Sequence, residues 1–382
     1  MGRYGVTASG VSITLSRVDD LAALGSRWRE LETRAEPSFF QTWTWMGCLV
    51  EERFPDPVLA EAREDGRVVA LALFNRRGAS FYLGESGDLG RDTIYIEFNG
   101  VMCETGREAE LTSACIRAAR GWSGFLPNVP RWSALVGTSR LVLSGIDMTA
   151  AAAVARTGYF RVARSQIAPH ATLNDADGDF LDRRSANTRA QIRRSDRVFA
   201  ALGSIAVTRA ETPDQALAFL DELGVLHQRT WTSRQRPGAF ASPFFIRFHR
   251  ALIEAGAPRR EIDLLRVSCG SHIIGFLYNF RYRGRSLAYQ SGFDYALGGR
   301  HGKPGLTCHH QAIRYLACLG VTRYDFLAGD DRYKRSLADG TETLYWIEAG
   351  GRFSPRFLAW RARDWLARPA GQMNGLSSET EL

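Results

Sequence analysis

Lysine is almost absent from this sequence of 382 residues. Of its 49 basic residues only Lys303 and Lys334 are lysines, and both lie in the C-terminal half. The chain still has a net charge of +8, so its positive charge comes almost entirely from arginine. This excess favours an anionic partner, such as a phosphate-bearing cofactor, a nucleotide sugar or RNA.

The sequence also lacks long apolar runs and paired cysteines. No stretch reaches the roughly 18 apolar residues of a membrane span, and no basic and then hydrophobic leader stands at the N-terminus. The six cysteines form no CxxC pair and no cysteine–histidine spacing typical of zinc. We therefore expect a cytoplasmic protein with free thiols, no membrane span and no metal.

The length and composition fit two ordinary soluble domains, with 45% hydrophobic and 24% charged residues. The aspartate-rich stretch Asn174–Asp179 carries no large apolar side chain and is the best candidate boundary. We predict an N-terminal domain over 1–180, a C-terminal domain over 181–370, and a disordered polar tail over 371–382.

Both halves mix helical and strand patterns, which indicates an α/β (α+β) fold. The N-terminal half begins with a helix at Asp19–Arg34, and the aromatic segment Phe39–Trp45 follows. A hairpin over Val58–Phe74 should turn at Asp65-Gly66. Ile94–Phe98 either turns Tyr95 and Glu97 toward a substrate cleft or is a plain strand with an exposed Glu97.

The C-terminal half opens with an arginine-rich helix at Asp182–Ala200, which is either a solvated surface helix or a landing surface for an anionic substrate. Three β-rich runs joined by short turns come later, and helices and strands alternate after them. The predicted elements are strands at Ile262–Val267, His272–Tyr282 and Arg285–Phe293, a helix at Leu306–Leu319, a strand at Arg323–Leu327 and a short helix at Asp330–Leu337.

The most informative segment is the glycine-rich loop between the strand ending at Phe293 and the helix beginning at Leu306. A loop that opens a helix presents free backbone N–H groups and a positive dipole end to an anion. Arg300 and Lys303 add charge, and Gly302 and Gly305 allow close approach of the backbone. The loop matches neither GxGxxG nor GxxxxGK[ST], so we expect a pyrophosphate cradle of another kind.

The order of antiparallel strands, Arg/Gly-rich loop, helix and strand resembles the acyl-CoA-binding core of the GNAT superfamily. More narrowly, the chain is similar to the acetyltransferase group named for cellulose biosynthesis (CelD/BcsL), which is related to the FemABX aminoacyl transferases. The similarity rests on Ala288–Asp294, Lys303–Gly305, Tyr324–Asp330 and Tyr333-Lys334, with the arginine-rich helix and Phe39–Trp45 in support. In the usual loop a glycine stands where this chain has Lys303.

The resemblance implies two tandem GNAT-like domains, each a mixed, mostly antiparallel sheet flanked by helices. It implies that the second domain binds acetyl-CoA or another acyl-CoA and that the first lies on the acceptor side without a cofactor. The strand end at Gln290, Ser291 and Gly292 should splay from its neighbour and pair with the pantetheine arm. Arg300, Gly302, Lys303 and Gly305 should bind the pyrophosphate.

Acyl transfer also needs an acid for the leaving thiolate and a base for the acceptor. We assign Tyr333 as the acid, Lys334 as electrostatic support, and Asp330 as a candidate base, although helix capping alone would explain Asp330. His309 and His310 are more consistent with core positions than with catalysis. In the N-terminal half, Tyr95, Glu97 and Trp45 are candidates for binding the acceptor.

The sequence therefore predicts transfer of an acyl group, acetyl in the first instance, to an amine or hydroxyl. The acceptor would be a small molecule or saccharide: a sugar, an amino acid or a natural-product intermediate. Two alternatives remain: a FemABX-like transferase that uses charged tRNA, and a GNAT fold that binds without catalysis.

Overall fold

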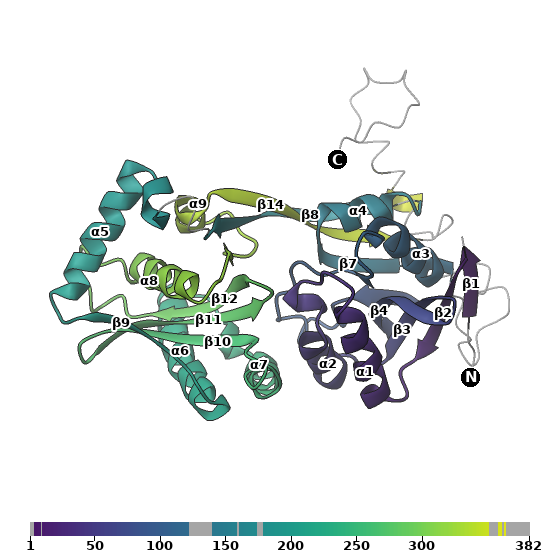
Figure 1. Cartoon of the computed structure of the whole chain (residues 1–382), viewed down its shortest axis with the longest axis horizontal. Coiled ribbons are helices and arrows are strands. Elements are labelled where there is room, and N and C mark those ends of the chain that lie inside the picture. Colours follow the sequence, from purple (N-terminus) through teal and green to yellow (C-terminus); the bar gives the residue numbers. More distant parts are fainter. Residues whose placement is uncertain are drawn as a thin grey trace, which may run out of the picture. The chain divides into compact units, whose positions relative to one another are not determined.

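The computed structural model describes residues 4–8, 10–121, 140–158, 160–173, 179–350, 358–360 and 363. The predicted tail at 371–382 lies outside these residues. The chain forms two compact units (Figure 1). The N-terminal unit contains the described residues up to Asp88, Ile96–Ser165 and those from Leu344, and the C-terminal unit contains Leu89–Tyr95 and Gln166–Thr343.

The N-terminal unit is a mixed, mostly antiparallel sheet with helices on both faces. Its strands follow the order β1-β2-β3-β4-β5-β7-β14, in which β14 is Gly340–Ala349; β6 pairs with β4, and β5 and β7 are parallel. The elements are β1 (Tyr4–Ala8), β2 (Val11–Arg17), α1 (Leu21–Glu32), η1 (Phe39–Gln41), α2 (Trp43–Glu52), β3 (Pro57–Glu64), β4 (Arg67–Arg77), β5 (Ser80–Leu83), β6 (Met102–Cys103), α3 (Glu108–Gly121), β7 (Arg140–Ile146) and α4 (Met148–Ala155).

Local sequence explains where these elements begin and turn. Asp20 caps α1 by accepting from the Ala23 N–H at 2.9 Å. The β3–β4 hairpin turns at Asp65 and Gly66, which both have positive φ, as predicted. Helices α3 and α4 cover one face of the sheet, and α1 lies on the other (Figure 1). The core is therefore formed between these layers, with buried side chains such as Val69.

The C-terminal unit is built on the same plan. Its strands follow the order β8-β13-β12-β11-β10-β9, in which only β12 and β13 are parallel among the pairs with described register. The elements are β8 (Phe160–Thr172), η4 (Phe180–Arg183), α5 (Ala186–Ala200), β9 (Ile205–Arg209), α6 (Pro213–Ser233), η5 (Ala239–Ala241), α7 (Pro243–Gly256), β10 (Ile262–Cys269), β11 (His272–Tyr282), β12 (Arg285–Phe293), α8 (Pro304–Cys318), β13 (Arg323–Asp325), α9 (Arg332–Leu337) and β14 (Gly340–Ala349).

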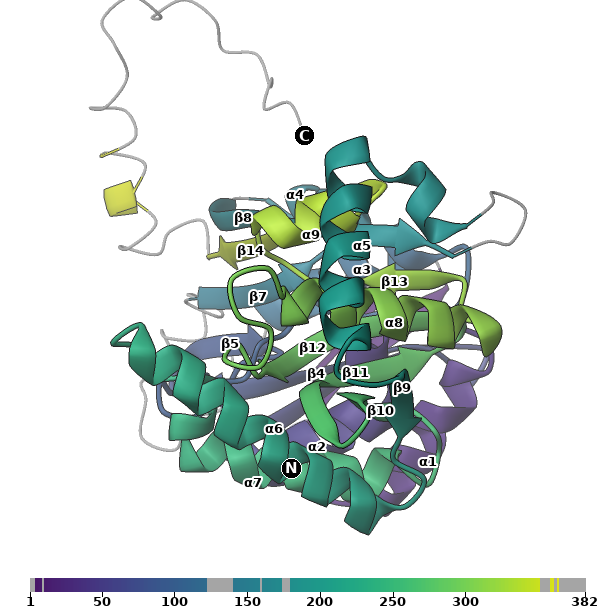
Figure 2. The ribbon, with the colours of Figure 1, turned by 90° about the vertical axis from the view of Figure 1, so that its left-hand side faces the viewer.

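Helices again lie on both faces of this sheet. Thr212 caps α6, and Pro213 occupies its first turn, where a missing N–H costs nothing. α6 and α7 lie on one face, and α8 lies on the other with α5 across it (Figure 2). The predicted fold class, two units each with a mixed sheet flanked by helices, is confirmed.

The division between the units differs from the predicted one at residue 180. β8 and β14 each run from one unit into the other, with the changes at Ser165 and Leu344. Leu89–Tyr95 groups with the C-terminal unit, although it lies early in the chain. Two shared strands and a short insertion leave no break in composition, so the sequence gives no signal for them.

Two other features differ from expectation. The N-terminal hairpin β1–β2 was not predicted. Ile94–Phe98 is a loop with Glu97 buried, which excludes one of its two alternatives, a plain strand with an exposed Glu97. Among the helices that the structure describes, none is long and apolar enough to cross a bilayer.

Candidate active site

The two parallel strands of the C-terminal unit run side by side for only three residues. Arg285–Leu287 of β12 pairs with Arg323–Asp325 of β13, and the pairing then ends. In the ladder between β12 and β11, Tyr289 is an extra residue without an opposite partner, and such a bulge bends its strand. The bulge and the end of the pairing indicate that the strands diverge before Ser291. We call this divergence the C-terminal wedge.

Helix α6 packs directly on the far end of β12. A Cβ atom on Gly292 would lie 2.4 Å from the Leu223 carbonyl oxygen, so only glycine fits there. The Ala239 N–H donates to His227 Nε2 at 3.2 Å, which leaves Nδ1 to donate to the Ser291 carbonyl at 3.0 Å. Burial lowers the pKa of His227, consistent with this neutral form. The Ser291 carbonyl thus has a protein partner that the sequence did not suggest.

The glycine-rich loop folds back on itself before α8. The Gly302 N–H donates to the Gly298 carbonyl at 2.8 Å, and a Cβ on Gly302 would lie 2.3 Å from the Gly298 Cα. Gly299 has a φ of +54°, and Arg300 beside it is exposed. Gly305 lies against Phe293, which a Cβ would approach to 3.3 Å. The glycines therefore shape a compact loop that holds Arg300 at the surface.

Lys303 is the residue before α8, and helix α5 holds it. The Lys303 N–H donates to Ser195 Oγ at 2.8 Å, and its Nζ donates to Gln191 Oε1 at 2.6 Å. The first backbone bond into α8 runs from Thr307 N to the Lys303 carbonyl at 3.1 Å. The N–H groups of Gly305 and Leu306 therefore have no acceptor within the helix.

Asp196 joins α5 to α8 through a buried polar group. It accepts from the Thr307 hydroxyl at 2.8 Å, from Gln311 at 3.2 Å and lies 2.8 Å from His310 Nδ1. His310 is 4% exposed and stacks on Phe180. His310 is thus a core histidine, as expected, and with its partners it fixes α5 beside the loop.

Tyr333 of α9 stacks on a buried histidine of α8. The rings of Tyr333 and His309 lie 5.4 Å apart and are nearly parallel, at 20°. His309 is 2% exposed, and its Nδ1 lies 3.0 Å from the Tyr324 hydroxyl. Phe293 and Phe326 pack edge-on against the same imidazole. Burial, with the Lys334 ammonium nearby, lowers the pKa of His309 to about 3, so it is neutral.

The phenol of Tyr333 is partly exposed and its hydroxyl is not held by a neighbouring side chain of the described residues. Its side chain is 37% exposed, and its hydroxyl makes no hydrogen bond to another residue that the structure describes. Desolvation of the phenol, with the nearby Asp331 and Tyr295, raises the pKa of Tyr333, so the hydroxyl keeps its proton near neutral pH. Tyr295, 53% exposed, is a second phenol at this place; it directly follows the strand motif and was overlooked.

Lys334 points away from Tyr333 and stabilises a turn. Its Nζ donates to the carbonyls of Leu327, at 3.2 Å, and Ala328, at 2.7 Å, and the side chain is buried. Leu327 has a φ of +60°, a strained conformation for a leucine. Lys334 therefore secures the turn before α9. Asp330 lies at the surface and pairs with Arg335 at 3.2 Å.

The three residues expected to bind the acceptor have different environments. Tyr95, in the C-terminal unit, is 54% exposed, and its backbone N–H donates to the Tyr289 hydroxyl at 3.1 Å. Glu97 is buried in the N-terminal unit, at 7%. Trp45 is fully buried, and its ring lies 4.8 Å from that of Phe40. The prediction that Trp45 contacts substrate is wrong, because its ring is part of the core.

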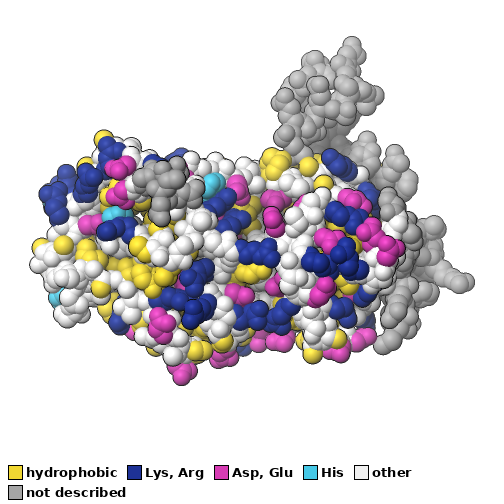
Figure 3. Space-filling model, viewed as in Figure 1, with side chains coloured by type: hydrophobic (Ala, Val, Ile, Leu, Met, Phe, Trp, Pro, Cys, Tyr) yellow, Lys and Arg dark blue, Asp and Glu magenta, His cyan; other side chains and the backbone are white. Residues whose placement is uncertain are grey.

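Arginines gather over α5, near the loop (Figure 3). Arg193, Arg194 and Arg197 are exposed, and none pairs with a carboxylate within the described ranges. Together with Arg300 and Lys303 they form a positive surface, which we call the α5 face. Such a surface attracts phosphate groups.

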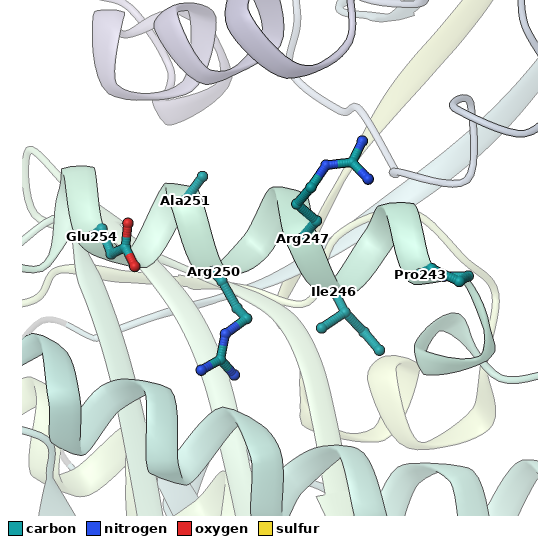
Figure 4. Close-up of a pocket in the computed structure, with 6 residues that line it drawn as sticks. All are labelled: Pro243, Ile246, Arg247, Arg250, Ala251 and Glu254. Atoms are coloured by element: carbon teal, nitrogen blue, oxygen red, sulfur yellow. The ribbon is translucent and has the colours of Figure 1, made fainter.

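Two shallow hollows lie elsewhere in the C-terminal unit. One, of about 470 Å³, runs along α7, where Arg250 turns toward Asp221 of α6 and Arg247 turns the opposite way (Figure 4). A second, of about 410 Å³, lies beside α8 and includes Phe180 and Tyr315. Neither contains Tyr333 or the glycine-rich loop.

The histidines, cysteines and carboxylates of the described ranges form no cluster of three or more that could hold a metal ion. The buried His227, His309 and His310 are bonded to neighbouring protein groups instead.

Comparison with known proteins gives one family match and several similar folds. Residues 186–335 match the family described as Acetyltransferase (GNAT) domain. FemX has a similar fold, with a TM-score of 0.58 and 10% identity over 91% of this chain and 99% of FemX. No curated protein sequence matches the chain.

Two further solved structures share the fold. One, from Agrobacterium fabrum, is described as a lysylphosphatidylglycerol synthetase C-terminal domain, and it has a TM-score of 0.55 and 12% identity over 94% of this chain and 100% of that domain. L-PGS from Bacillus licheniformis has a TM-score of 0.51 and 9% identity over 89% and 95% of the two chains. The family match thus makes residues 186–335, within the C-terminal unit, similar to GNAT acetyltransferase domains.

Proposed function

We propose that this protein transfers an acyl group, acetyl in the simplest case, from acyl-CoA to an amine or hydroxyl of a small molecule or saccharide. Within the GNAT superfamily we assign it to the CelD/BcsL group on the sequence motifs. The observation that carries the proposal is the free, protonated phenol of Tyr333 near the C-terminal wedge, where β12 and β13 diverge. A thioester bound there would have an acid beside its sulfur.

The donor would bind along β12 and the loop before α8. Backbone groups of Gln290 and Gly292 are the candidates for the pantetheine arm, because the Ser291 carbonyl is already bound by His227. The pyrophosphate would lie against the Gly305 and Leu306 N–H groups, with Lys303 supplying charge. Arg300 and the compact turn ending at Gly302 complete the proposed cradle.

The chemistry is nucleophilic substitution at the thioester carbonyl. The acceptor nitrogen or oxygen forms a bond to the carbonyl carbon, and the carbon–sulfur bond then breaks. The CoA thiolate takes the proton of the Tyr333 phenol, and the phenolate is reprotonated from solvent. Asp330, as an exposed carboxylate, is the candidate to accept the proton that the acceptor loses.

Lys334 acts indirectly in this scheme. The sequence suggests electrostatic support of the reaction, but the Lys334 ammonium is bound to the Leu327 and Ala328 carbonyls. Its proposed role is to fix the turn that presents Tyr333; the pKa of His309 is lowered chiefly by burial, and the Lys334 ammonium adds to that effect.

The α5 face favours a second candidate function. Exposed arginines without acidic partners also suit RNA, as a transferase that uses charged tRNA would require. Such binding would weaken steeply with salt, by roughly one power of salt concentration for each phosphate contact. Binding of a single CoA molecule would depend on salt much less.

Thermal unfolding with added ligands tests the proposal. Acetyl-CoA at about a hundred times its Kd should stabilise the fold by roughly 2 to 3 kcal/mol, whereas NAD and ATP should not, since only a ligand of the native state stabilises it. No shift with any acyl-CoA would overturn the proposal, and salt-sensitive tRNA binding would then support the alternative. If acyl-CoA stabilises the protein but no amine or hydroxyl acceptor is acylated, the protein would be a GNAT fold that binds acyl-CoA without catalysis.

A further inference from the structure

The C-terminal unit contains the same histidine–tyrosine contact twice, once on each face of its sheet (Figure 2). His309 of α8 has its Nδ1 3.0 Å from the hydroxyl of Tyr324, in β13. His249 of α7 has its Nδ1 3.2 Å from the hydroxyl of Tyr278, in β11. All four side chains are buried, with exposed fractions of at most 2%. We call these contacts the α8 pair and the α7 pair.

The two pairs differ in what lies on the histidine ring. The phenol ring of Tyr333 stacks on His309, with centroids 5.4 Å apart and planes at 20°. The rings around His249 meet it at angles of 52° or more, and all of them are buried; they belong to Phe245, Phe248, Tyr278 and Tyr289. Of the two pairs, the α8 pair therefore holds a partly exposed phenol and the α7 pair does not.

The Tyr333 ring has little support besides His309. Its helix, α9, has six residues, and Tyr333 is the second of them. The side chain is 37% exposed, and its hydroxyl bonds to no other residue that the structure describes. One further described ring lies near it, that of Phe326, edge-on at 6.5 Å. The orientation of the phenol therefore depends mainly on the plane of the His309 imidazole.

That plane is itself fixed on several sides. A hydrogen bond to a ring nitrogen lies near the plane of the ring, so the contact with Tyr324 restrains rotation of the imidazole. Phe293 and Phe326 pack edge-on against His309, at 5.9 and 5.7 Å. Burial, with the Lys334 ammonium adding to it, lowers the pKa of His309 to about 3. The imidazole therefore stays neutral at ordinary pH and keeps its place in the core.

We propose that the α8 pair positions the acid: the Tyr324 hydroxyl fixes the imidazole of His309, and the imidazole holds the phenol of Tyr333 in the orientation that proton donation requires. Proton transfer needs its two heavy atoms about 2.6 to 3.2 Å apart. A displacement of about 1 Å can slow a reaction roughly a hundredfold. His309 and Tyr324 are thus positioning residues that act through Tyr333. The role of Tyr333 as the acid rests on the function proposed above, whereas the stacking does not.

Matched variants of the two pairs test the inference. Tyr324→Phe removes only the hydroxyl of the α8 pair, and Tyr278→Phe removes the same atom from the α7 pair. With acetyl-CoA and the best acceptor from a panel of amino sugars, amino acids and alcohols, Tyr324→Phe should lower kcat about tenfold and leave acetyl-CoA affinity unchanged. His309→Phe should behave likewise, and Tyr278→Phe should turn over like the parent. Parent-like kcat in both α8 variants, or an equal loss in Tyr278→Phe, would overturn the inference.

A double variant separates positioning from a general loss of structure. If the α8 pair acts through the Tyr333 hydroxyl, Tyr324→Phe should cause no further loss of kcat once Tyr333→Phe has removed that hydroxyl. A further loss of about tenfold in the double variant would mean that Tyr324 acts independently of Tyr333, and it would overturn the inference.

NMR of protein carrying ¹³C-labelled tyrosine tests the contact without an acyl donor. The Tyr333 ring signal, assigned by its loss in Tyr333→Phe, should move in His309→Leu and in Tyr324→Phe and stay in place in Tyr278→Phe. An unmoved signal in both α8 variants would overturn the inference. If the signal moves as expected but the parent acylates no acceptor, the proposed function is refuted and the stacked arrangement of Tyr333 stands.

Discussion

The two units share one strand geometry and fill it with different chemistry. In the N-terminal unit, the side-chain amide of Asn99 bridges the ends of the parallel strands β5 and β7 by donating to the carbonyls of Leu83 and Ser144, and glycines at both strand ends accept it. In the C-terminal unit, an aromatic cluster lies at the divergence, and the phenol of Tyr333 has no protein partner among the described residues. The two units therefore share a strand geometry, but a side-chain amide bridges it in one unit and a phenol hydroxyl without a hydrogen-bond partner among the described residues lies beside it in the other.

The units also differ in their response to acid, because all seven histidines lie in the C-terminal unit. Burial lowers the pKa of both His249 and His309 to about 3. Below the ordinary histidine pKa of about 6.5, these histidines bind protons in the unfolded chain but not in the folded one. The free energy of unfolding therefore decreases as the pH is lowered. The loss is about 1.4 kcal/mol per pH unit for each histidine.

At pH 4.5 these two histidines should cost the C-terminal unit roughly 5 kcal/mol. Hydrogen exchange, corrected for intrinsic rates, should therefore show the C-terminal unit losing protection between pH 6.5 and 4.5 well before the N-terminal unit. His249→Phe should reduce the slope by about half, while the exposed His272→Gln should not change it. Parallel loss of protection in both units would contradict the comparison.

The sequence predicted the fold class well because strand and helix periodicities are local signals. The hairpin at Asp65-Gly66, the three strands β10 to β12 and the helix after the glycine-rich loop all appear near their predicted bounds. The sequence could not predict that β8 and β14 each belong partly to both units. Each has the pattern of an ordinary strand, and that pattern does not depend on the unit in which each half packs.

The site was predictable only in part, for a physical reason. Tyr333 could be chosen because a phenol after a strand and turn suits acid chemistry, but the direction of Lys334 depends on which carbonyls the turn leaves within reach. Trp45 carries the same sequence signal whether its ring is exposed or buried. Asn99 and His227 act through contacts with residues distant in sequence or with another element's backbone, and no local pattern marks them.

Tyr333→Phe tests whether acyl transfer at the C-terminal wedge depends on the Tyr333 hydroxyl. The variant keeps the ring on His309 and removes only the hydroxyl, so turnover should fall about a hundredfold while acetyl-CoA affinity stays nearly intact. Tyr315→Phe, on the same unit but in α8 beside the second hollow, is the matched control and should turn over like the parent. Parent-like turnover of Tyr333→Phe would mean that the acid lies elsewhere, with Tyr295 the next candidate.

Lys303→Ala tests the smallest expected effect, which is the contribution of the Lys303 ammonium to acetyl-CoA affinity. Its ammonium is exposed and bonded to Gln191 at 2.6 Å, so its loss should change stability little. A charge-assisted bond to phosphate contributes about 1.5 to 3 kcal/mol, so acetyl-CoA affinity should fall roughly tenfold or more. Isothermal titration measures the loss, and Arg117→Ala, an exposed arginine on α3 of the N-terminal unit, should leave affinity unchanged.

If Lys303→Ala binds as tightly as the parent, the loop is a structural turn and the phosphate contacts must come from the α5 face. If Arg117→Ala weakens binding equally, the effect is one of total charge and does not distinguish the units. A loss confined to Lys303→Ala that shrinks as salt rises would place a direct ionic contact at this residue, because ions screen exposed charges over about 8 to 10 Å at ordinary salt.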